Sequence, residues 1–210
     1  MVGGFKMSVF DLYPQEYDSW FIKNPGWYES ELEAVRKMLP EKGKGVEIGA
    51  GTGKFAVPLK IETGVEISKE MGKKAEENGL KMVYAMAENL PFMNHSFDFS
   101  LMVTTFCFLK NPLEGLKEAY RILKPGGVFI NAIVDKESPL GKIYVLKKEE
   151  SRFYREAFFY SVDETVELMK KAGFKDFEYR QTIHDIENKN FEPSFPGYGK
   201  GSFVVIKCIK

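Results

Sequence analysis

A glycine-rich stretch between residues 46 and 55 has the composition and spacing of a ligand-binding turn. It reads VEIGAGTGKF, so a short apolar run passes into Gly49, Gly51 and Gly53. Glycine accepts positive φ angles and has no Cβ, which lets a ligand approach the backbone closely. The stretch therefore indicates a cofactor site, or else a turn that is rich in glycine only because a strand and a helix pack tightly there.

Two further residues narrow the class of ligand. A dinucleotide-binding G-x-G-x-x-G motif has its third glycine where this chain has Lys54, so pyrophosphate binding is disfavoured. Glu66 ends the next expected strand, where a carboxylate can accept hydrogen bonds from both hydroxyls of a ribose. Together they predict a nucleoside beside the glycine turn. The alternative for Glu66 is a solvated carboxylate at a strand end.

From residue 43 onward, short apolar runs typical of strands alternate with longer segments of helical period. This alternation is typical of a parallel sheet covered by helices on both faces. Helix start signals are Ser68, Asn111 with Pro112, and the Ser161–Glu164 capping box. Helices are accordingly expected to end near residues 78, 123 and 172. Strands are expected at residues 45–48, 63–67, 81–85, 97–104, 128–134, 174–183 and 203–209, the last one antiparallel.

The first forty residues differ from the rest in their aromatic content. They predict one or two amphipathic helices, of which residues 29–39 are the clearest, and the segment could be a lid that excludes water. The alternative is plain packing of aromatic side chains onto the core. We expect a helical cap over residues 1–42 and a ligand-binding domain over residues 43–210. The aromatic residues of this cap are Phe10, Tyr13, Tyr17, Trp20, Phe21, Trp27 and Tyr28.

Five motifs in order, VEIGAGTG, VEIS, AENLPF, SFDFSLMVTTF and EAYRILKPGG, resemble the class I S-adenosylmethionine-dependent methyltransferases. The resemblance implies an α/β, doubly wound, Rossmann-like sheet of seven strands, six parallel and one antiparallel. It also implies S-adenosylmethionine as cofactor, S-adenosylhomocysteine as product, and a cofactor site at the carboxyl ends of the first strands.

The resemblance also assigns cofactor-binding residues by position. Glu47 and the backbone of the glycine turn would hold the methionine moiety, Glu66 the ribose, and Ile67 the adenine. Met86 stands where relatives commonly carry an aspartate that bonds the adenine amino group, and an apolar thioether cannot replace that bond. The complete predicted set is Glu47, Gly49, Ala50, Gly51, Gly53, Glu66, Ile67, Met86, Ala87, Glu88, Thr104, Thr105 and Phe106.

No residue stands out as an obligatory catalyst. Displacement at a sulfonium methyl needs mainly alignment, and a base matters only if the acceptor arrives protonated. His184 and Asp135 are candidates because each follows a strand whose carboxyl end should face the substrate, and Tyr17 could contact the cofactor from the cap. A structural or surface role is the alternative for each of the three. The loop 185–200 could shape the acceptor pocket or simply connect two strands.

Composition bounds the partners. Thirty basic and thirty acidic residues balance, which argues against a nucleic acid partner, and Cys107 and Cys208 lack metal-ligand spacing, so no metal is expected. The two widely separated cysteines indicate a reduced, cytoplasmic setting. No apolar run approaches about 18 residues, so no membrane contact is expected. We expect a monomer or a homodimer. The sequence favours methyl transfer to the N, O or C atom of a small-molecule acceptor. Alternatives are a non-catalytic S-adenosylmethionine-binding regulatory or partner subunit, a nucleic-acid methyltransferase, and a nicotinamide-dependent oxidoreductase.

Overall fold

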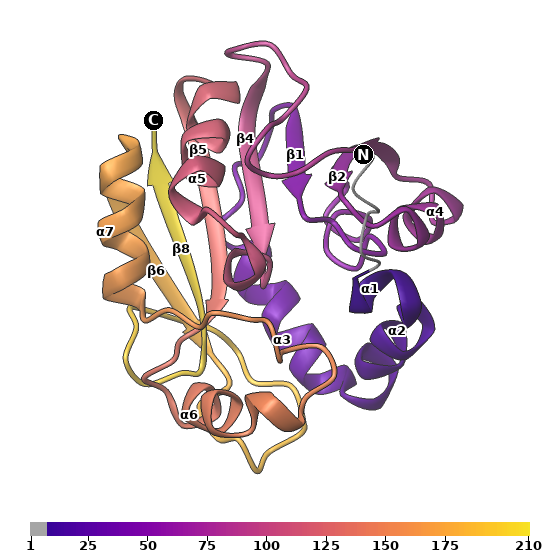
Figure 1. Cartoon of the computed structure of the whole chain (residues 1–210). Coiled ribbons are helices and arrows are strands. Elements are labelled where there is room, and N and C mark those ends of the chain that lie inside the picture. The colour runs from indigo at the N-terminus through magenta and orange to yellow at the C-terminus, as the bar shows by residue number, and fades with distance from the viewer. Residues whose placement is uncertain (1–7) are drawn as a thin grey trace.

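The computed structural model describes residues 8–210, which form one eight-stranded sheet with helices on both faces (Figure 1). The first seven residues of the predicted cap lie outside the described residues. The helices are α1 (Val9–Leu12), α2 (Pro14–Lys23), α3 (Pro25–Arg36), α4 (Lys69–Glu77), α5 (Pro112–Ile122), α6 (Pro139–Leu146) and α7 (Val162–Ala172), with short 3-10 turns η1 (Phe106–Phe108) and η2 (Lys148–Glu150). The strands are β1 (Gly45–Ile48), β2 (Thr63–Glu66), β3 (Lys81–Tyr84), β4 (Phe97–Val103), β5 (Leu123–Val134), β6 (Lys175–Thr182), β7 (Phe195–Pro196) and β8 (Phe203–Ile209).

The strands follow the order β3-β2-β1-β4-β5-β8-β6-β7. Strands β1 to β5 are parallel, and β8 lies antiparallel between β5 and β6, so β6 runs in the same direction as the first five. The predicted arrangement of six parallel strands and one antiparallel strand is confirmed. The two-residue β7, which pairs with β6 at the sheet edge, is an addition that the sequence did not predict.

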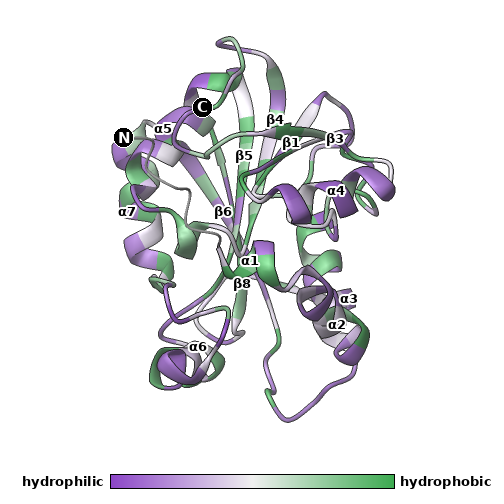
Figure 2. Ribbon diagram, turned by 45° about the vertical axis from the view of Figure 1, so that its right-hand side comes forward, coloured by the Kyte–Doolittle hydropathy of each residue, from purple (hydrophilic) through white to green (hydrophobic). Residues whose placement is uncertain are grey.

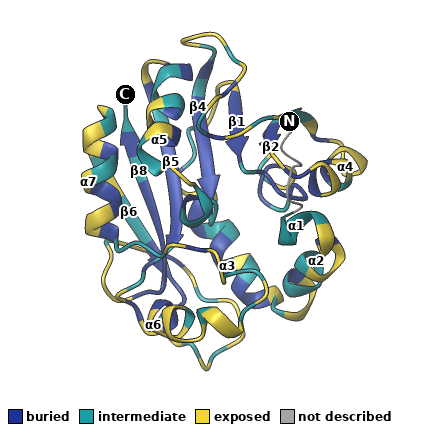
Figure 3. Cartoon of the chain, viewed as in Figure 1, coloured by how far each residue is buried: buried dark blue, intermediate teal, exposed yellow. Residues whose placement is uncertain are grey.

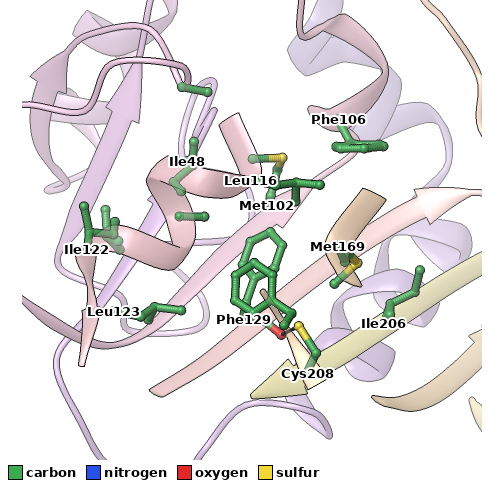
Figure 4. Close-up of a cluster of buried hydrophobic side chains, with 14 of the residues drawn as sticks. Ile48, Met102, Phe106, Leu116, Ile122, Leu123, Phe129, Met169, Ile206 and Cys208 are labelled. Carbon is green, nitrogen blue, oxygen red and sulfur yellow. Dashed lines mark hydrogen bonds between the residues drawn. The ribbon is translucent and has the colours of Figure 1, made fainter. Parts of the chain in front are cut away.

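Two apolar layers hold the sheet between its helices. One layer packs α5 and α7 against one face through residues such as Leu116, Met169 and Phe129, and Figure 4 shows part of it. The other packs α3 and α4 against the opposite face, with Ala34, Val35 and Ala75. The central strands are accordingly buried along most of their length (Figure 3), and the helices turn their polar faces outward (Figure 2).

The local signals read from the sequence begin and end the helices as expected. Ser161 and Glu164 form a reciprocal capping box at the start of α7, and Gly173 ends that helix at φ +110°. The Ser68 side chain accepts a hydrogen bond from Met71 N at the start of α4. These caps fix where the helices leave the carboxyl edge of the sheet.

Several boundaries differ from the sequence predictions. Residues 54–61 form hydrogen-bonded turns and no regular helix, since Pro58 cannot donate to a helical ladder. Strand β5 begins at Leu123, directly after α5, instead of at residue 128, and its pairing with β4 shifts register between Phe97 and Phe99. The N-terminal segment forms three helices, not one or two, and α3 starts earlier than residue 29 because Pro25 suits the first helical position. Helix α6 was not predicted.

Candidate functional site

The glycine turn lies between β1 and the segment that leads to β2, at the carboxyl edge of the sheet. Gly49, Gly51 and Gly53 all have positive φ, at +74°, +55° and +84°. A Cβ on Gly49 would overlap the side chain of Thr105, so this glycine is required by packing. A Cβ on Gly51 would meet nothing closer than Met71 Cε and Tyr17 Oη, both at 3.5 Å. The space in front of Gly51 is therefore open for a ligand that approaches the backbone.

Glu66 ends β2 beside this turn. Its Oε2 accepts a hydrogen bond from Gly51 N at 2.9 Å, and its Oε1 accepts from Ile67 N at 2.9 Å and Ser68 N at 2.8 Å. A carboxylate offers about four acceptor positions, so three backbone bonds leave one for a ribose hydroxyl. Burial raises the pKa of Glu66, and the three N–H groups act in the opposite direction by stabilising the charge. The carboxylate is thus held in place before any ligand arrives.

A cavity of about 480 Å³ extends from Glu66 and the glycine turn to the helices of the N-terminal segment. Ten of the sequence-predicted residues line it. They are Tyr17, Gly49, Gly51, Glu66, Ile67, Met86, Ala87, Glu88, Thr104 and Thr105. Thr105 also donates to Gly49 O at 3.1 Å, which ties the end of β4 to the glycine turn.

Four predicted cofactor residues lie behind the cavity wall instead of in it. Glu47 is 2% exposed and accepts a hydrogen bond from Ala56 N at 2.7 Å, so it supports the segment after the glycine turn. Burial raises the pKa of Glu47 to about 8. Ala50 and Gly53 are buried within the turn, and Phe106 belongs to the core beneath α5. These four residues support the cavity wall from behind and so help to set the shape of the cavity.

The end of the cavity near residues 67 and 86 is apolar. Ile67 is 53% exposed and Met86 40% exposed, so both present unshielded apolar surface at its rim. The carboxylate of Glu88 accepts hydrogen bonds from the N–H groups of Lys110 and Asn111, at 3.0 and 3.2 Å. Glu88 thereby connects two loops of the rim, and a flat apolar ring would pack between Ile67 and Met86.

Two of the three catalytic candidates do not reach the cavity. His184 Nδ1 lies 3.3 Å from Glu192 Oε2, and its ring packs edge-on against Phe195. Asp135 is 5% exposed and accepts a hydrogen bond from Glu137 N at 3.1 Å within the turn before α6. Because both side chains serve local structure, the geometry gives neither of them access to an acceptor.

The loop 185–200 does not line the cavity either. It packs against α3, where Trp27 Nε1 donates to Asn188 O at 2.7 Å. Glu192 N donates to Ser30 Oγ at 2.8 Å, also on α3. The loop therefore fixes α3 in place and affects the cavity only through that helix.

Helices α1 and α2 form a roof over the cavity. Phe10 of α1 contacts Phe108 and Phe153, with ring centroids 5.1 and 5.6 Å apart. On α2, Asp18 accepts a hydrogen bond from Thr52 Oγ1 at 2.6 Å and pairs with Lys74 at 3.2 Å. The roof is thus anchored to the glycine turn and to α4 on one side and to aromatic side chains on the other.

Several cavity residues were not foreseen from the sequence, and Glu31 of α3 is the most notable. It lines the cavity, although it shares the buried side of α3 with Trp27, Ala34 and Val35. A charged residue at helical spacing within an apolar stripe was the signal that could have found it. Among the aromatic wall residues, those not foreseen are Phe108, Tyr144, Phe153 and Tyr154.

Comparison with known proteins identifies the class. Residues 46–131 match a methyltransferase domain family. A solved structure from Thermotoga maritima, described as an S-adenosylmethionine-dependent methyltransferase and "possible histamine N-methyltransferase", is 50% identical, with a TM-score of 0.94 over 96% of this chain and 98% of that one. The chain belongs to the class I S-adenosylmethionine-dependent methyltransferases, and its cofactor is S-adenosylmethionine.

Two curated relatives add context. An uncharacterized protein of Methanocaldococcus jannaschii is 47% identical over 97% of this chain and 100% of its own length. A ubiquinone/menaquinone biosynthesis C-methyltransferase of Rickettsia bellii is 29% identical over 82% of this chain and 86% of its own length. Across residues 8–210, no helix has the length and apolar character needed to cross a bilayer. The same residues bring together no group of three or more His, Cys, Asp or Glu side chains able to hold a metal.

Proposed function

We propose that this protein transfers a methyl group from S-adenosylmethionine to a small-molecule acceptor through an N, O or C atom. The observation that carries the proposal is the cavity, which runs without interruption from the open glycine turn to an aromatic chamber under α1, α2 and α6. Residues of α1 and α2 line this cavity together with those of the glycine turn, an arrangement that suits a compact acceptor better than a polymer. The helices of residues 1–42 would then be the cap of the acceptor chamber.

The residues present fit the cofactor. The backbone around Gly49 and Gly51 would hold the methionine part, and Tyr17 Oη, which lies near Gly51, would add a donor for its carboxylate. Glu66 would bind the ribose. Ile67 and Met86 would enclose the adenine between apolar surfaces, which compensates for the aspartate that relatives commonly carry at the latter position.

Position and exclusion of water would supply most of the catalysis. Bound S-adenosylmethionine supplies a methyl group on a sulfonium, whose sulfur is a good leaving group. Holding the acceptor in line with that methyl group can be worth roughly 7 to 11 kcal/mol. Trp20, Phe108 and Phe153 add aromatic surface to the cavity wall, which would keep water from the reacting atoms.

The relatives support a small acceptor without fixing its identity. The Thermotoga protein is described as possibly acting on histamine, and the Rickettsia protein belongs to quinone biosynthesis. Two alternatives stay open: a cofactor-binding partner subunit without activity, and a nucleic-acid methyltransferase. The balanced charge of the chain gives no basis for the second.

The test begins with calorimetric titration of the protein with S-adenosylmethionine and S-adenosylhomocysteine. Glu66→Gln should weaken the binding of both ligands by about 10- to 100-fold, because a charged hydrogen bond contributes about 1.5 to 3 kcal/mol. Labelled methyl transfer to pooled small metabolites, with transfer RNA and DNA as comparison acceptors, then defines the acceptor class. Cofactor binding without transfer to any acceptor would contradict the proposed activity, and transfer to nucleic acid alone would contradict the small acceptor.

A further inference from the structure

One buried acid of the cavity wall has no partner among the described residues. Glu31 is 6% exposed, and no described side chain or backbone group donates a hydrogen bond to its carboxyl group or forms an ion pair with it. The other acids of the cavity wall are engaged: Glu66 and Glu88 accept backbone hydrogen bonds, and Glu16 pairs with Arg152. Glu31 alone among these four faces the chamber with its acceptor capacity unused.

The surroundings of Glu31 are aromatic. Tyr144 of α6 and Tyr154 of the following segment share the wall with it, and their rings are stacked with centroids 5.0 Å apart. Trp20 of α2 lines the same cavity. Two lysines, Lys23 and Lys110, also belong to the wall, but both are exposed and neither forms an ion pair with Glu31.

An ionised carboxylate in such a place is costly. Removing it from water without a partner disfavours its charged form strongly. Burial accordingly raises the pKa of Glu31 to about 8. A cationic ligand would remove this penalty by supplying the missing charge, and the faces of surrounding aromatic rings attract a cation as well. A neutral ligand supplies no such charge, so the carboxyl group stays mostly protonated beside it at neutral pH.

We propose that the acceptor chamber recognises a substrate with a cationic amino group, for which Glu31 is the counter-ion and the aromatic wall encloses the rest of the molecule. This inference rests on the proposed function, because it names the chemical class of the acceptor for the same cavity. Glu31 is a specificity-determining residue in this proposal, and the amine is bound by charge, hydrogen bonds and ring faces.

The test compares ligands that share a ring and differ in charge. Phenethylamine, phenethyl alcohol and para-cresol are titrated calorimetrically into protein saturated with S-adenosylhomocysteine, at neutral pH. Phenethylamine should bind at least ~10-fold more tightly than either neutral compound, since a desolvated ion pair is worth more than a neutral hydrogen bond. Glu31→Gln should lower the affinity for phenethylamine by at least ~10-fold and change the affinity for phenethyl alcohol by less than about threefold.

Controls separate this inference from the proposed function. Glu29→Gln makes the same change on the exposed side of α3 and should leave all affinities as in the wild type. Glu31→Gln should bind S-adenosylhomocysteine normally, which shows that the variant is folded. If the wild type fails to bind S-adenosylhomocysteine, the proposed function is wrong. If the wild type binds S-adenosylhomocysteine but prefers para-cresol or binds no phenethylamine, only the amine inference is overturned. The same holds if Glu31→Gln loses affinity for phenethylamine and phenethyl alcohol equally.

Discussion

Replacing Glu31 by glutamine should change how the stability of the protein depends on pH. Burial raises the pKa of Glu31 from 4.5 to about 8 in the folded protein. Below pH 4.5 the group is neutral in both the folded and the unfolded chain, so it costs nothing. As the pH rises from 4.5 towards 8, the unfolded chain ionises and the folded chain does not, so folding is progressively disfavoured.

The size of the effect follows from the two pKa values. At about 1.4 kcal/mol for each pKa unit, the full loss is about 5 kcal/mol above pH 8. Most of it, about 4 kcal/mol, falls between roughly pH 5 and roughly pH 9. Glutamine does not titrate, so Glu31→Gln should be spared this loss. The groups that face Glu31, which are Tyr17, Tyr28, Tyr144 and Tyr154, have pKa values raised by burial and stay neutral over this range.

The assay is urea unfolding followed by far-ultraviolet circular dichroism, at roughly pH 5 and roughly pH 9. The proteins compared are the wild type, Glu31→Gln and the exposed control Glu29→Gln. Glu47 also has a raised pKa, but it is present in all three proteins and cancels in the comparison. The gain in unfolding free energy of Glu31→Gln over the wild type should grow by about 4 kcal/mol from the lower to the higher pH. A gain that is equal at both pH values, within about 0.5 kcal/mol, would refute the reasoning.

Two further predictions test the donor site and the base. Gly51→Ala should weaken the binding of S-adenosylhomocysteine by at least ~10-fold, because the alanine methyl group enters the space in front of the turn. Gly126→Ala, also at positive φ but with nothing within 4 Å, should cost a similar strain of about 1 to 2 kcal/mol without affecting binding; equal affinity in both variants would count against the site. His184→Gln should keep the methyl-transfer rate of the wild type, since His184 contacts Glu192 outside the cavity, and a large loss of rate at unchanged stability would restore it as a base.

The fold and the donor side of the site could be predicted because their signals are local. A glycine turn after an apolar strand, a carboxylate at the end of the next strand, and caps such as Ser161 with Glu164 each depend on a few neighbouring residues. The rule that parallel strands meet at one edge then brings Gly51 and Glu66 together, and the hydrogen bond between them confirms their proximity.

The acceptor side could not be predicted, because it depends on contacts between distant segments. Glu31 reaches the cavity from α3, a helix held by the sheet face and by the loop 185–200, and Tyr144 reaches it from a helix with no clear sequence signal. The strand-edge rule placed His184 at the correct edge of the sheet. It could not show that Glu192, eight residues later, would hold the ring away from the cavity.

Helix α2 links the two ends of the cavity mechanically. Asp18 fastens it to Thr52 beside the glycine turn, and Glu16, half a turn earlier, fastens it to Arg152 in the aromatic wall. Because both residues lie on one ten-residue helix, a substitution that displaces α2 at Asp18 should also alter its contact with the segment around Arg152.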